Sequence, residues 1–172
     1  MNRCNIFNLS VITALGLALL PTNGVAQQRS LKDQLVGAWT MVSNEVTAPN
    51  GAKEQFYGAN PKGVLILDAS GQYAFVAGRL DRAKFKNASR FELDATPAEL
   101  KAALLGFGAN AGTWSVNEAD KTLTRRYESA VIPNNEGSEQ KNSVNLSGDQ
   151  LKLTVTSPVT GVRTDAVYRR AK

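Results

Sequence analysis

The chain has 172 residues, one cysteine, no histidine and a formal net charge of +5. A chain of this length is typical of a single domain of ordinary size. Without histidine it lacks the commonest general base near neutral pH and the commonest transition-metal ligand, so Ser–His hydrolysis and histidine-based metal sites are excluded. Acids are interspersed with the cations along the sequence, which favours a solvated surface over a nucleic-acid interface.

The first 26 residues differ from the rest of the chain. One cation, Arg3, precedes an almost wholly apolar stretch over 9–20, and small residues follow before the predicted cleavage point. This order is typical of a secretory signal peptide, and the apolar stretch is shorter than the roughly 20 residues that a membrane span needs. We therefore predict a signal peptide over 1–26 and a mature domain over 27–172 that is exported, periplasmic or extracellular, with no integral membrane span. Cys4 would leave with the signal, which excludes disulfides and thiol chemistry from the mature chain.

The first elements of the mature chain are a short helical turn and three strands. Ser30 can cap a turn over 31–35,. Alternating side chains over 38–47 indicate a strand, and two further alternating runs, 62–67 and 72–77, flank a turn signal and predict a hairpin,.

A charged segment and one helix interrupt this pattern. Residues 79–94 carry both charges and few large apolar side chains, which predicts a long surface loop that either covers the mouth of a pocket or is simply solvated,. Thr96 and Glu99 form a capping box with proline between them, which predicts a helix running to about Leu105,. Its expected apolar stripe consists of Leu100, Leu104 and Phe107.

Short strands joined by tight turns complete the chain. They are predicted over 113–116, 122–130, 140–146, 150–156 and 163–170. Eight consecutive short strands with regular turns indicate a sandwich or a barrel. We expect an all-β fold, an eight-stranded antiparallel up-and-down barrel with one short helix between strands 3 and 4. Such a barrel has no free edges and can hold one small ligand.

Two features of the strands resemble the lipocalin superfamily. Gly37 and Trp39 open the first strand, and Arg169 or Arg170 ends the last. In that fold the tryptophan plugs the closed end of the barrel and the arginine lies over it. The chain also resembles a bacterial group, the lipocalin-like domain proteins, in stretches 35–39, 60–66, 81–85, 96–99 and 146–151. The resemblance implies a lipocalin-like barrel with a pocket and says little about activity.

The alternation of side chains along each strand predicts which residues face the interior of the barrel. Because alternate side chains face opposite ways, the Trp39 phase would also bring in Met41, Ser43 and Glu45,. Tyr73 and Phe75 share a face on their strand. They could form an aromatic wall for a flat apolar ligand, or they could be plain core packing.

On strand 122–130 the phase is ambiguous. Either Arg125 and Tyr127 or Arg126 and Glu128 point inward. We favour the second pair, because Arg126 stands where the resemblance leads us to expect histidine. This pair could orient a ligand carboxylate or carbonyl, or it could lie exposed on the outer face of the barrel. Asn142 stands where the related group often has arginine, and it completes the candidate ligand-binding set of Met41, Ser43, Glu45, Tyr73, Phe75, Arg126, Glu128 and Asn142.

These observations favour a protein of the cell envelope that binds a small apolar or amphipathic molecule. We expect no cofactor, no metal site, no catalytic residue and no nucleic-acid partner, and nothing in the sequence indicates an oligomeric state. One alternative is an enzyme of isomerase or cyclase type that moves a proton with Glu45, or with Glu128 beside Tyr127,. Another is a structural or interaction protein whose barrel is filled with side chains.

Overall fold

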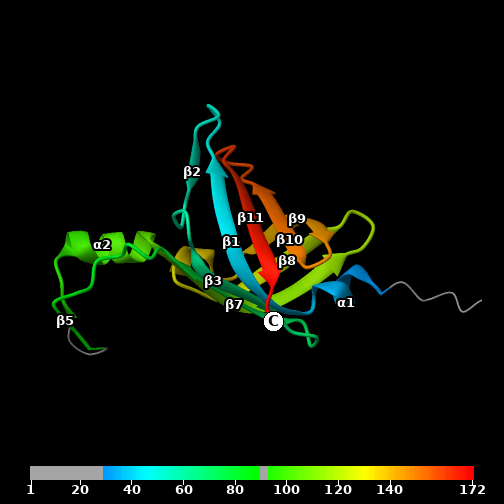
Figure 1. Ribbon diagram of the computed structural model, residues 1–172, viewed down its shortest axis with the longest axis horizontal. Helices are drawn as coiled ribbons and strands as arrows, with labels where there is room; N and C mark the ends of the chain where they lie inside the picture. Colours follow the sequence, from blue (N-terminus) through cyan, green and yellow to red (C-terminus); the bar gives the residue numbers. More distant parts are fainter. Residues whose placement is uncertain (1–28, 90–92) are drawn as a thin grey trace, which may run out of the picture.

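Eight long antiparallel strands form a closed ring in the described residues, 29–89 and 93–172, of the computed structural model (Figure 1). They are β1 (Gly37–Thr47), β3 (Lys62–Leu67), β4 (Gln72–Gly78), β7 (Phe107–Asn117), β8 (Thr122–Ala130), β9 (Glu139–Ser147), β10 (Gln150–Thr156) and β11 (Arg163–Arg170). Each pairs with the next ring strand along the chain, and β11 pairs back with β1. The expected all-β up-and-down barrel is therefore confirmed, while the predicted signal peptide over 1–26 lies outside the described residues.

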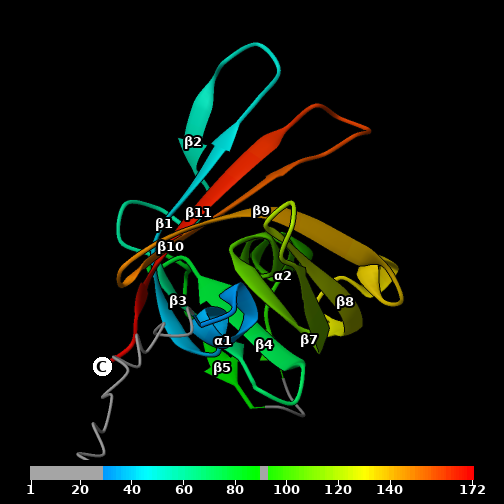
Figure 2. The same ribbon diagram turned by 90° about the vertical axis from the view of Figure 1, so that its right-hand side faces the viewer.

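Shorter elements lie outside the ring. They are α1 (Leu31–Leu35), β2 (Lys53–Gln55), β5 (Asn87–Ala88), β6 (Leu93–Asp94), α2 (Pro97–Leu105) and a 3-10 turn (Pro133–Asn135). β2 folds back on the outer end of β1, and Figure 2 shows the β1–β2 and β10–β11 hairpins extending side by side past the other strands. β5 and β6 pair only with each other among the described residues.

The helix position needs correction. With β2, β5 and β6 counted, α2 lies between β6 and β7 and not between strands 3 and 4. The sequence pattern missed these strands because each has only two or three residues, too few to show an alternation. The capping box is present as expected, since Thr96 accepts from the backbone N–H of Glu99 and the Glu99 carboxylate accepts from that of Thr96.

The packing of α2 also differs from the expectation. None of its residues is buried, and Leu100 and Leu104 are 41% and 42% exposed. In Figure 1, α2 and β5 extend away from the barrel, on the side opposite α1. The two leucines of the expected apolar stripe are therefore largely exposed, whereas Phe107 belongs to β7 and is half-buried.

The half of the barrel next to α1 is filled by side chains. The largest fully buried side chains among the described residues are Leu35, Trp39, Leu65, Leu67, Leu123, Leu151 and Leu153. The Trp39 indole donates to the Leu35 carbonyl at 2.8 Å, and the Arg170 guanidinium lies 4.1 Å from the centre of the Trp39 ring. Arg170 also donates to the Val36 carbonyl, which ties the last strand to the segment after α1. The lipocalin-like closed end is thus present, and Arg170 rather than Arg169 closes it.

A bulge in β1 reverses the direction of its side chains. Met41 pairs with Tyr168 and Ser43 with Val167, so Val42 is an extra residue that opposes no partner on β11,. Paired residues of antiparallel strands share a face, and Tyr168 faces inward whereas Val167 faces outward,. From Ser43 onward, the residues expected inside therefore lie outside.

A second bulge lies where β7 meets β8. Gly112 pairs with Tyr127 and Ala111 with Ser129, which leaves Glu128 without a partner on β7. A Cβ atom on Gly112 would stand 2.1 Å from the Arg126 carbonyl oxygen, so only glycine fits this close approach,. β7 begins six residues before the expected strand 113–116. The sequence pattern missed its first half because that half is rich in glycine and alanine and shows no apolar alternation.

Candidate ligand-binding site

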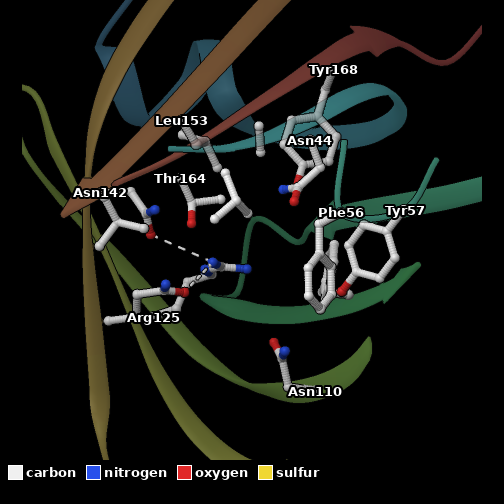
Figure 3. A pocket seen from close by; sticks show the side chains of 14 residues that line it. Asn44, Phe56, Tyr57, Asn110, Arg125, Asn142, Leu153, Thr164 and Tyr168 are labelled. Carbon is white, nitrogen blue, oxygen red and sulfur yellow. Dashed lines mark hydrogen bonds between the residues drawn. The ribbon is translucent and has the colours of Figure 1, made fainter. Parts of the chain in front are cut away.

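The half of the barrel away from α1 holds a cavity of about 250 Å³ (Figure 3). Its wall combines side chains from every ring strand except β3 with two from the segment after β2. The lining residues are Asn44, Val46, Phe56, Tyr57, Phe75, Asn110, Arg125, Gln140, Asn142, Leu153, Val155, Thr164, Ala166 and Tyr168. None of them comes from 79–105, so neither the charged segment nor α2 lines this cavity.

One side of the cavity is aromatic. Phe56 and Tyr57 pack edge to face, with ring centres 4.9 Å apart. The backbone N–H of Phe56 donates to the Asn44 carbonyl at 2.9 Å, which holds this segment against β1. A Cβ atom on Gly108 would lie 2.2 Å from the Tyr57 hydroxyl oxygen, so the glycine leaves room for the buried Tyr57 ring. An aromatic wall of this kind suits an apolar ligand.

The other side is organised around Arg125 (Figure 3). This side chain is only 7% exposed, and its Nη2 donates to the Gln140 side-chain oxygen at 2.6 Å and to that of Asn142 at 3.5 Å. The Tyr127 hydroxyl donates to the same Gln140 oxygen, which fixes the amide. The Nε atom of Arg125 is buried and has no hydrogen-bond partner among the described residues.

Arg125 is the one charged residue in the wall. The ion pairs found within the described residues do not include it. Glu45 pairs with Lys53 at 2.8 Å, and Arg126 approaches Glu139 at 3.9 Å, both on the outer face. The cavity therefore has a positive charge that no carboxylate of the described chain balances.

The tyrosines around the cavity are held in their neutral form. Burial raises the pKa of Tyr57, Tyr73 and Tyr127, although the nearby Arg125 charge lowers each of them in part. Burial likewise raises the pKa of Tyr168 to about 12. At neutral pH these side chains are hydroxyls that can donate and accept hydrogen bonds, not phenolates that could act as bases.

The structure divides the residues predicted from the sequence into two groups. Phe75 and Asn142 line the cavity, while Met41 and Tyr73 are buried in the core beside it. The remaining four, Ser43, Glu45, Arg126 and Glu128, do not line the cavity, and the expected inward orientation is wrong for them. The β1 bulge accounts for Ser43 and Glu45, and the phase of β8 accounts for the other two. A role in binding stays a prediction for the whole set.

Several lining residues are absent from the set predicted from the sequence. Asn44 and Val46 were missed because the bulge at Val42 leaves no mark in the apolar pattern. Arg125 was missed because Arg126 and Glu128, which face the opposite side of the same strand, were expected to point inward. Tyr57 lies in a segment with no strand periodicity, and no signal in the sequence pointed to it.

Neither a metal cluster nor a membrane-spanning helix is present in the described part of the chain. Within 29–89 and 93–172, no group of three or more acidic, histidine or cysteine side chains could hold a metal ion. In the same ranges, no helix is long and apolar enough to cross a membrane.

These features define a small antiparallel barrel with one closed end and one internal pocket. The chain matches the lipocalin-like domain family over residues 36–171, and it belongs to that family. This confirms the resemblance inferred from the sequence.

Two solved structures are similar at low identity. A de novo designed fluorescence-activating β-barrel has a TM-score of 0.40 and 10% identity, over 83% of this chain and 99% of that chain. A mutant of the fluorescent protein UnaG has a TM-score of 0.35 and 15% identity, over 81% of this chain and 97% of that chain. No curated protein matches the chain.

Proposed function

We propose that this protein is an exported carrier of the cell envelope that binds one small, largely apolar molecule inside its barrel. The observation that carries the proposal is the cavity of about 250 Å³ in the half of the barrel that the core leaves open. This volume is slightly below the roughly 300–1,000 Å³ of typical small-molecule sites, so it suits a small ligand,. The envelope location rests on the leader-like pattern of residues 1–26,.

The alternatives receive less support from the geometry. Glu45 pairs with Lys53 outside the barrel, and Glu128 is exposed, so neither carboxylate that the enzyme hypothesis invokes reaches the cavity. The neutral tyrosines of the wall offer no base near neutral pH. A barrel filled with side chains would leave no space of this volume.

Native mass spectrometry tests the carrier proposal directly. The protein is isolated gently from its own cell envelope and weighed before and after denaturation. A discrete added mass that denaturation removes is the expected result, and it would identify the class of ligand.

A binding assay with a neutral apolar probe locates the site. The probe is N-phenyl-1-naphthylamine, whose fluorescence is followed on titration. Thr164→Phe places a ring in the cavity and should weaken binding by about tenfold or more, a loss of roughly 1.4 kcal/mol,. Val167→Phe adds the same ring to the outer face of β11 and should leave the affinity unchanged. If the wild-type protein carries no added mass and does not bind the probe, the proposal is refuted.

A further inference from the structure

The burial, charge and hydrogen-bond partners of Arg125 indicate the chemistry of the ligand. A guanidinium stays charged at neutral pH, and burying a charge without a counter-charge is unfavourable. Arg125 is 7% exposed, yet its partners Gln140 and Asn142 are neutral amides. A structural arginine would be expected to have a carboxylate partner, whereas this one faces a cavity,.

The hydrogen bonds of Arg125 leave part of the guanidinium free for a ligand. Its bonds to Gln140 and Asn142 both come from Nη2, so Nη1 has no hydrogen-bond partner within the described residues, whereas Nε also lacks a partner but is too deeply buried to face the cavity. The Gln140 amide that orients Nη2 is itself fixed by the Tyr127 hydroxyl, at 2.5 Å. The group is therefore held in place before any ligand arrives, with unused N–H donors beside the cavity.

The rest of the wall limits the ligand to one negative charge on an apolar body. Among the lining residues Arg125 alone is charged, so a single negative charge neutralises the site and a second would be left unpaired. Beyond the arginine the wall combines apolar side chains, among them Val46, Phe56, Leu153 and Val155, with neutral polar ones such as Asn44, Asn110 and Thr164. A carboxylate matches both the charge and the hydrogen-bonding geometry of a guanidinium.

We propose that the ligand of this cavity is an amphipathic carboxylate whose anionic head accepts hydrogen bonds from the free N–H groups of Arg125. This inference rests on the proposed function, because it names the class of molecule that the same cavity binds. Gln140 and Asn142 act as positioning residues that hold the guanidinium, and the apolar part of the ligand lies against the aromatic and aliphatic wall.

Competition between two matched ligands tests the inference. Decanoate and decan-1-ol have the same chain and differ in the charge of the head group, and each is titrated against bound N-phenyl-1-naphthylamine at pH 7.5. Decanoate should displace the probe at a concentration at least about tenfold lower than decanol, as hydrogen bonds to a charged group would allow. It should also raise the melting temperature of the wild-type protein more than decanol does.

Two neighbouring arginines provide the variant and its control. Arg125→Met removes the buried charge while keeping a long side chain against Tyr73 and Phe75. It should abolish the preference for decanoate and still bind the neutral probe. Arg126→Met removes one charge from the outer face of the same strand and should keep the preference. If Arg125→Met does not fold, Arg125→Lys retains the charge without the planar fork, and it should keep a weaker preference for decanoate over decanol.

The outcomes separate the two proposals. Probe binding with equal displacement by decanoate and decanol would overturn the carboxylate inference and leave the carrier proposal standing. The carboxylate inference is equally overturned if Arg125→Met keeps the full preference or Arg126→Met loses it. If the wild-type protein binds neither the probe nor a co-purified ligand, the carrier proposal fails and the inference fails with it.

Discussion

Arg170 is predicted to stabilise the closed end of the barrel. Its guanidinium lies 4.1 Å from the centre of the Trp39 ring and donates to the carbonyls of Gln34 and Val36. A cation–π contact that is partly desolvated contributes about 1–2 kcal/mol. A hydrogen bond from a charged group contributes roughly 1.5–3 kcal/mol when buried, and less here because about a third of the side chain is exposed,. Arg170→Met keeps the packing over Trp39 and should lower the free energy of unfolding by about 2–3 kcal/mol.

Urea unfolding followed by tryptophan fluorescence measures this loss. With a slope of about 2 kcal/mol per molar urea, the midpoint should fall by roughly 1–1.5 M while the slope stays constant. Arg169→Met is the matched control, because Arg169 is exposed on the same strand and should change stability by no more than about 0.5 kcal/mol,. Equal losses in the two variants, or a loss below about 0.5 kcal/mol for Arg170→Met, would refute the role assigned to the stacked arginine.

Three further predictions concern the bulges and one ion-pair cluster. Gly112→Ala should cost about 1–3 kcal/mol in urea unfolding, because its Cβ would stand 2.1 Å from the Arg126 carbonyl oxygen, and an unchanged midpoint would contradict this packing,. Glu45→Gln should leave probe affinity unchanged at every pH, since Glu45 lies outside the barrel, and a pH-dependent loss of binding would return it to the site. Burial alone would raise the pKa of Asp165, but hydrogen bonds from Thr154, Arg163 and Lys152 lower it from 3.8 to about 2. Because the folded pKa is the lower one, this contribution, about 1 kcal/mol after screening by solvent, is complete above about pH 4 and is lost as the pH falls towards 2. Asp165→Asn should remove that dependence in acid unfolding curves, and an identical pH profile would argue against it.

Much of the barrel could be predicted from local patterns. The expected strands 62–67, 122–130, 150–156 and 163–170 have the same bounds in the structure. Strand alternation and turn signals depend only on residues close together in the sequence, so they can be recognised without knowing which strands pair. The capping box before α2 is equally local, and it formed as expected.

The candidate site was harder to predict than the strands. A single extra residue, Val42, exchanged Ser43 and Glu45 for Asn44 and Val46 inside the barrel. A bulge is defined by two strands together, and the sequence of one strand does not show it. The favoured phase of β8 was wrong because it followed the position at which the resemblance predicts histidine, whereas Leu123 and Arg125, on the other face of the strand, are the buried residues.

By itself, the sequence determined the strand-rich fold and excluded histidine chemistry, and its resemblance to lipocalins predicted the closed end at Trp39. Only the tertiary structure decided that Arg125 faces the cavity and Arg126 the solvent. It also decided that the leucines of α2 lie outside the core. The physical reason is that alternation fixes which side chains share a face, whereas pairing with strands distant in sequence fixes which face is buried.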